Sequence, residues 1–105
     1  MAKTNHADFR TVEVKVGDTT YHLRELSVGE TDDIEDATTG QDGKINFRLN
    51  SRMALSMSIE EPAVTPDEIA GWPTTKYGLL IRAFNKLNTA ESPNDSGQSG
   101  SNEQT

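Results

Sequence analysis

The sequence contains no cysteine, only two histidines and no long hydrophobic run. Without cysteine, disulfides, thiol chemistry and zinc sites built on thiolates are excluded. No segment approaches the ~20 apolar residues that span a bilayer. The first residues, MAKTNHADFR, lack the apolar stretch of a secretory signal. We therefore expect no membrane segment and no secretion signal, and by default a protein that is made and used in the cytoplasm.

Apolar side chains are scarce as well, since they make up only 32% of the 105 residues. This share is below that of an ordinary globular protein. A chain of this length suits one domain with a single modest core. Either part of the chain lies outside that core, or another protein completes it.

The charge balance is acidic, with 17 acids against 10 bases and a net charge of −7. Three of the acids, Glu91, Asp95 and Glu103, lie beyond residue 88 with no base among them, which leaves about −4 for the rest of the chain. Nucleic acids and anionic membranes attract clustered bases, whereas the bases here are scattered. The composition therefore disfavours nucleic acid and membrane surfaces as partners.

Motifs for catalysis or metal binding are also missing. The sequence contains no GxSxG, no P-loop and no GxGxxG, and neither histidine is placed to suggest a triad or a zinc site. The stretch from Asp42 to Phe47 resembles the middle of a calcium-binding loop. However, Thr38 and Leu49 occupy the positions of its first carboxylate and its bidentate glutamate, so a glycine-rich turn is the stronger interpretation. We expect no catalytic residue, no metal and no cofactor.

Residues 9–26 predict a β-hairpin. Residues 9–16 alternate apolar and polar side chains, Gly17-Asp18 suits a two-residue turn, and residues 19–26 return. Counting back from the turn gives a register with one apolar and one charged face. The predicted pairs are Val14 with Tyr21, Val12 with Leu23, Glu13 with His22, and Thr11 with Arg24.

Helices are expected after the hairpin. Ser27 and Glu30 have the spacing of a capping box at the start of an acidic helix. Thr65 suits the N-cap of a short helix with proline at its first position, and Thr74 or Thr75 is expected to cap the last helix. The predicted helices span residues 27–37, 45–59, 65–70 and 74–88.

The apolar residues of the second predicted helix form two stripes, which indicate burial over much of its circumference. One stripe contains Ile45, Leu49, Met53 and Met57, and the other contains Phe47, Leu55 and Ile59. Beyond residue 88 the composition cannot offset the entropy of ordering. We therefore predict an α+β domain over residues 9–88, with an N-terminal β-hairpin followed by a small bundle of three to four helices. Residues 1–8 are expected to be flexible, and residues 89–105 to form a disordered acidic tail.

Three groups of residues are candidates for binding another protein. The acids of the first helix either keep the chain soluble or form an electrostatic docking face. Met53 and Met57, together with Phe47, either fill the core or form an adaptable surface. The single tryptophan, held in a Gly-Trp-Pro turn, either caps the core or anchors an interface. The predicted protein-binding residues are Trp72, Met53, Met57, Glu30, Asp33 and Asp36.

The order of these signals resembles the tail assembly chaperones of long-tailed phages and related prokaryotic viruses. The similarity covers about residues 9–88. The segments that carry it are YHLRELSVGE at 21–30, LSMSIEEP at 55–62, TPDEI at 65–69 and YGLLIRAFNKLN at 77–88.

The resemblance implies a non-enzymatic role in assembly. Such proteins bind the tape measure protein and tail tube subunits in the host cytoplasm and are generally absent from the finished virion. Many also exist as a longer frameshifted form, and this chain resembles the short one. Self-association into a homo-oligomer is left open.

Two other functions remain as alternatives. One is a structural tail or head–tail connector subunit that stays in the virion. The other is a small acidic regulator that binds a host protein through the first helix.

Overall fold

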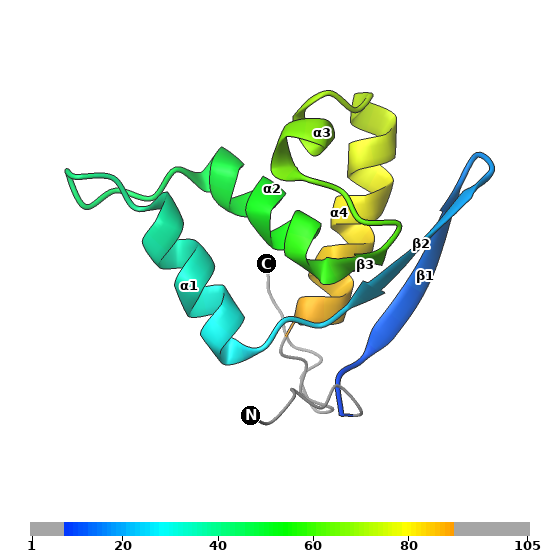
Figure 1. Cartoon of the computed structure of the whole chain (residues 1–105), viewed down its shortest axis with the longest axis horizontal. Helices are drawn as coiled ribbons and strands as arrows, with labels where there is room; N and C mark the ends of the chain where they lie inside the picture. The colour runs from blue at the N-terminus through cyan, green and yellow to red at the C-terminus, as the bar shows by residue number, and fades with distance from the viewer. Residues whose placement is uncertain (1–7, 90–105) are drawn as a thin grey trace, which may run out of the picture.

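The computed structural model describes residues 8–89, and the fold class predicted from the sequence is confirmed: an N-terminal β-hairpin is followed by helices (Figure 1). The predictions for residues 1–7 and 90–105 lie outside the described residues. The elements in chain order are β1 (Thr11–Val16), β2 (Thr19–Arg24), α1 (Val28–Thr38), α2 (Phe47–Ser58), β3 (Ile59–Glu61), α3 (Pro66–Ala70) and α4 (Thr74–Asn88).

The hairpin has the predicted register, and every predicted pair is confirmed. Gly17 begins the turn with φ of 63°, a conformation that glycine adopts without steric penalty. A third strand was not predicted: β3 pairs antiparallel with β2, so the sheet has the order β1-β2-β3. Only three residues form β3, and two of them are glutamates, so its sequence shows no strand alternation.

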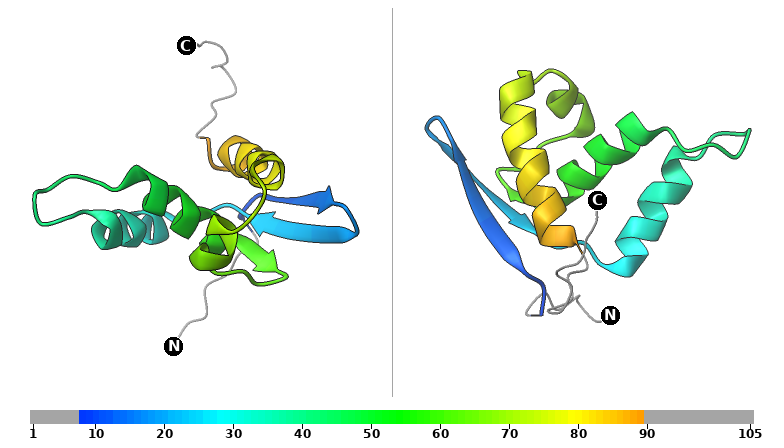
Figure 2. Two further views of the ribbon diagram at one scale, coloured as in Figure 1. Left: turned by 90° about the horizontal axis from the view of Figure 1, so that it is seen from above. Right: turned by 180° about the vertical axis from the view of Figure 1, so that it is seen from behind.

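One cluster of buried apolar residues joins the sheet to the helices. Its buried members come from β2, from the end of α2 and the start of β3, and from α3 and α4. Viewed from behind, α4 runs between the hairpin and α2 and so covers the apolar side of the sheet (Figure 2). The buried members are Tyr21, Leu23, Leu55, Ile59, Ile69, Leu80 and Leu87.

The second predicted helix is shorter and less buried than expected. It spans residues 47–58 rather than 45–59, because Ile59 already belongs to β3. Leu55 and Ile59 are buried as predicted, but the side chain of Phe47 is 74% exposed. Burial over much of the helix circumference was therefore a wrong prediction for its N-terminal half, which reaches beyond the core.

The helix starts follow local sequence rules, with one exception. Both capping boxes are present, Ser27 with Glu30 in α1 and Thr65 with Glu68 in α3. The N-cap of α4 is Pro73, which makes no side-chain cap, so the predicted threonine cap is wrong. Proline fixes an extended entry into that helix without donating a hydrogen bond.

Arg24, the last residue of β2, is a buried charged residue with 7% exposure. Its guanidinium donates to both carboxylate oxygens of Glu30, at 2.8 and 2.7 Å, and lies 3.5 Å from the carboxylate of Glu60. Its backbone carbonyl accepts a hydrogen bond from Ser58 Oγ at 2.6 Å. One arginine therefore ties the end of β2 to α1, to the end of α2 and to β3.

Glu30, which binds Arg24, also forms the capping box in the first turn of α1. The backbone amide of Ser27 donates to Glu30 Oε1 at 2.8 Å, and Ser27 Oγ accepts from the Glu30 amide at 3.1 Å. The pKa of the Glu30 carboxyl is held at about 2, against an ordinary 4.5, chiefly by the hydrogen bonds from Arg24. The same contact raises the pKa of Arg24. The pair is therefore charged throughout the neutral and mildly acidic range.

Helix α1 is joined to the fold mainly at its ends. Ile34 is its one buried large apolar side chain and is not a member of the core cluster. At the C-terminal end, Asn50 Nδ2 donates to Thr38 Oγ1 at 3.1 Å and the Asn46 amide donates to the Thr38 carbonyl at 2.8 Å. Polar contacts at both ends therefore fix the direction of this helix.

The C-terminal end of α4 is tied to the start of the sheet. The guanidinium of Arg10 donates to the carbonyl of Thr89 at 3.1 Å, and its backbone amide donates to Glu25 Oε1 at 2.9 Å. Asn88 Oδ1 accepts from the amide of Leu26 at 2.8 Å. These contacts fasten the chain from Leu26 and Arg10 to Asn88 and Thr89.

Glu30→Gln is expected to destabilise the domain at pH 7 and to flatten its acid sensitivity. Since the folded pKa of Glu30 lies below the unfolded one, its contribution is fully present above pH 4.5 and is lost as pH falls toward 2. The shift corresponds to roughly 3 kcal/mol. Urea unfolding at a series of pH values measures it, and glutamine keeps the capping acceptor.

Glu35→Gln is the matched control, because Glu35 lies exposed on the same helix. That variant should follow the wild-type pH curve. A Glu30→Gln protein that loses stability between pH 5 and 2 as steeply as wild type would contradict the assigned role of this carboxylate.

Candidate protein-binding site

A groove lies where the start of α2 meets α3 and the start of α4, and it has a volume of ≈ 390 Å³. The floor of this groove is apolar. We call the whole groove the Phe47–Trp72 groove. Its volume lies at the lower end of the ~300–1,000 Å³ that ligand sites usually have. The lining residues are Phe47, Arg48, Ser51, Arg52, Ile69, Ala70, Trp72, Thr74 and Tyr77.

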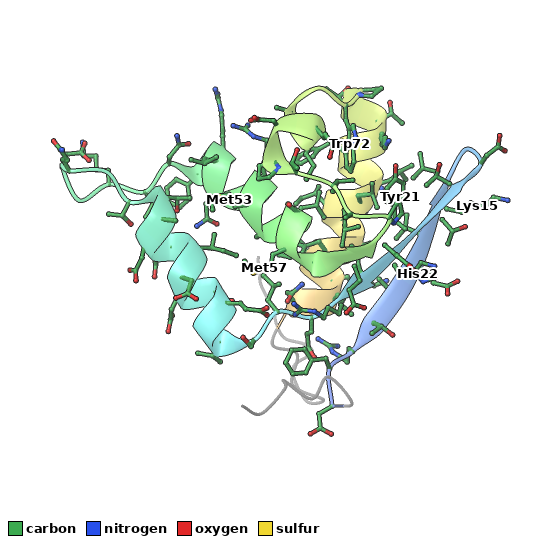
Figure 3. The ribbon with its side chains drawn as sticks, viewed as in Figure 1. Lys15, Tyr21, His22, Met53, Met57 and Trp72 are labelled. Carbon is green, nitrogen blue, oxygen red and sulfur yellow. The ribbon has the colours of Figure 1, made fainter. Side chains whose placement is uncertain are left out.

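Trp72 lies at the inner side of this groove and contributes to both core and surface. Its ring centroid is 5.8 Å from that of Tyr21, a buried core residue, and the two rings are tilted by 60°. The ammonium of Lys76 lies 4.3 Å from the centroid of the tryptophan ring, within the range of a cation–π contact. The packing of Trp72 against the core agrees with a core cap, and its place in the lining of the groove leaves the role of interface anchor as a prediction (Figure 3).

Two arginines line the same groove one helical turn apart on α2. Within residues 8–89, the side chains of Arg48 and Arg52 have no ion-pair or hydrogen-bond partner. No carboxylate is among the groove-lining residues. The groove therefore combines an apolar floor with unneutralised positive charge on a chain whose net charge is −7.

A second groove of ≈ 670 Å³ lies between α1, α2 and the C-terminal half of α4. Phe47 lines both grooves, so this exposed ring forms part of the boundary between them. The other exposed apolar residue here is Val28, at 79%. The apolar lining residues of this second groove are Leu26, Val28, Ile34, Ile45, Phe47, Ala54 and Phe84.

The predicted methionines lie on α2, away from Trp72 (Figure 3). Neither Met53 nor Met57 is a member of the core cluster, and Met57 is 37% exposed. Neither lines the Phe47–Trp72 groove. The structure therefore does not bring the methionines and the tryptophan together into one surface.

The predicted acids of α1 divide into two kinds. Glu30 is bound to Arg24 and to the first turn of its own helix, so it serves the fold. Asp33 and Asp36 are exposed and have no ion-pair partner within residues 8–89. Only these two remain available to a partner.

The residues considered for metal binding make local contacts. His22 Nδ1 lies 3.2 Å from Glu13 Oε2 across the hairpin, as the register predicted, and Asp42 Oδ1 accepts from the Lys44 amide at 3.0 Å within its turn. Over residues 8–89, no group of three or more histidines and carboxylates is arranged to hold a metal ion. In the same range, no helix has the length and apolar character that crossing a membrane requires.

Sequence reasoning missed the arginines of this site, and it offered a surface position for Phe47 only as the alternative to burial in the core. In the sequence, Arg48 and Arg52 look like the ordinary polar side of an amphipathic helix. Their spacing of four residues was the available signal, because like charges at that spacing repel on a helix. Nothing local indicated that Ile69 and Tyr77, from two other helices, would lie beside them.

Comparison with known proteins gives no relative: no protein-family model, no curated protein and no solved structure matches this chain.

Trp72→Ala is expected to lower the free energy of unfolding by about 1–3 kcal/mol, because the half-buried ring packs against the core. Trp72→Phe should recover most of that loss. Urea unfolding followed by circular dichroism measures both variants, since the chain has no other tryptophan to report fluorescence. Full stability of the alanine variant would show that the contact with Tyr21 does not form.

Proposed function

We propose that this protein is an assembly chaperone for a viral tail, which acts by binding and without catalysis. It would hold the tape measure protein and tail tube subunits in the host cytoplasm and leave before the virion is complete. The ordered sequence segments described above suggest this process, since they resemble those of tail assembly chaperones. The fold supplies a surface suited to such holding.

The observation that carries this proposal is the exposure of Phe47. The ring of Phe47 is 74% exposed and lines two neighbouring apolar grooves, so it belongs to a continuous apolar surface and is not an isolated exposed side chain. Both grooves offer apolar floors that a helical segment of another protein can cover. Burial of this surface by a client would also add to the single modest core that a domain of this size forms.

The runner-up is a regulator that binds a host protein through α1. The observation that favours it is the exposed acidic side of that helix, which includes Asp33 and Asp36. The two functions place the contact on different residues. Phe47→Ser should impair a chaperone, whereas Asp33→Asn with Asp36→Asn should impair the regulator.

Phe47→Ser is expected to weaken client binding about tenfold while leaving the melting temperature within a few degrees of wild type, because the ring is mostly exposed. The test is co-expression with a tagged tape measure protein from the same virus. Gel filtration then gives the soluble complex that each variant recovers.

Leu79→Ser is the control, because Leu79 is 40% exposed on α4 and lines neither groove. It should recover as much complex as wild type. Equal recovery by the Phe47→Ser protein would overturn the assignment of the surface. Stoichiometric amounts of the protein in purified virions would favour a retained structural subunit.

A further inference from the structure

We infer that the Phe47–Trp72 groove binds a short amphipathic segment in which carboxylate side chains flank a row of apolar ones. This inference rests on the proposed function, because it names the class of segment that a client presents. It does not require the client to be a particular tail protein. The argument uses the floor of the groove, its charge and the chemistry of its side chains.

The apolar floor calls for apolar side chains in the partner. Ile69, Ala70 and the ring of Trp72 line the groove beside Phe47 and Tyr77. Ile69 is 2% exposed and belongs to the core cluster, so this floor is continuous with the core. A concave apolar surface favours a segment whose own apolar residues lie on one side, as in an amphipathic helix.

The positive charge calls for carboxylates in the partner. Arg48 and Arg52 repel each other at a spacing of four residues, and no acid within residues 8–89 neutralises either side chain. The chain has 17 acids from which a purely structural arginine could draw a partner. Arginine binds carboxylates through paired hydrogen bonds, and arginine, tryptophan and tyrosine are enriched at the residues that dominate protein interfaces.

Other occupants fit this charge and shape less well. Nucleic acid or an anionic membrane presents negative charge over an area much larger than the two arginines, so the rest of a chain with net charge −7 would repel it. A second copy could offer the acidic helix α1, yet Val28 is the one large apolar residue that this helix exposes. Residues 90–105 include acids but no large apolar side chain. An external segment with both properties is therefore the occupant to which we commit.

The test uses the full chain and three synthetic helical peptides that share one leucine face and contain no aromatic residue. Their flanking positions are all Glu, all Gln or all Lys. Emission from Trp72 reports occupancy directly, because it is the chain's one tryptophan and lines the groove. We expect the Glu peptide to bind on the order of tenfold more tightly than the Gln peptide, and the Lys peptide to bind most weakly.

The double variant Arg48→Glu/Arg52→Glu should reverse the order, so that the Lys peptide binds best. The matched control is Arg82→Glu/Lys86→Glu, which changes two exposed cations at the same spacing on α4, outside this groove. The control should keep the wild-type order. If the Glu substitutions unfold the domain, Arg48→Gln/Arg52→Gln should abolish the preference between the Glu and Lys peptides.

Failure of this inference is distinguishable from failure of the proposed function. Equal affinity for the three peptides, no binding of any peptide, or the same order in the arginine variants would overturn the charge assignment. Association of the chain with itself that displaces the peptides would also overturn it, in favour of a second copy. Binding of the Glu peptide without binding of tail proteins would overturn the function alone.

Discussion

The paired hydrogen bonds between Arg24 and Glu30 bring together three parts of the structure. Arg24 ends β2 and accepts a hydrogen bond from the last residue of α2, while Glu30 closes the first turn of α1. A buried guanidinium without its carboxylate would be strongly unfavourable. The position of the first turn of α1 relative to the sheet therefore depends on this contact, and this turn contributes to the wall of the larger groove.

Much of the fold follows from local sequence rules. The hairpin register follows from a glycine turn and an alternating pattern, and two capping boxes mark where α1 and α3 begin. Strand β3 could not be predicted, because its three residues are held by backbone pairing with β2 rather than by a pattern of their own. The stripe with Met53 and Met57 did not join the core cluster, whereas Leu55 and Ile59 of the other stripe did. Helical spacing alone does not reveal which stripe meets the core.

The candidate site was predictable only in part. Trp72 stands out in the sequence as a single large ring in a turn, and the structure places it in the groove. Arg48, Arg52 and Phe47 join it because α3 and α4 fold back onto the start of α2, which is long-range information. Among the acids, Glu30 serves the fold, which the capping-box spacing did indicate, whereas its arginine partner was invisible to spacing rules.

The attachment of α1 has a consequence for cooperativity. The core cluster links the hairpin, the end of α2, α3 and α4, whereas α1 adds Ile34 outside it and is fastened by polar contacts at its two ends. Helices fastened in this way can detach in sub-global openings that leave the remaining core folded. Amide hydrogens of α1 would then exchange faster than those of β2. Each detachment of α1 would also remove one wall of the larger groove and expose its apolar lining to solvent.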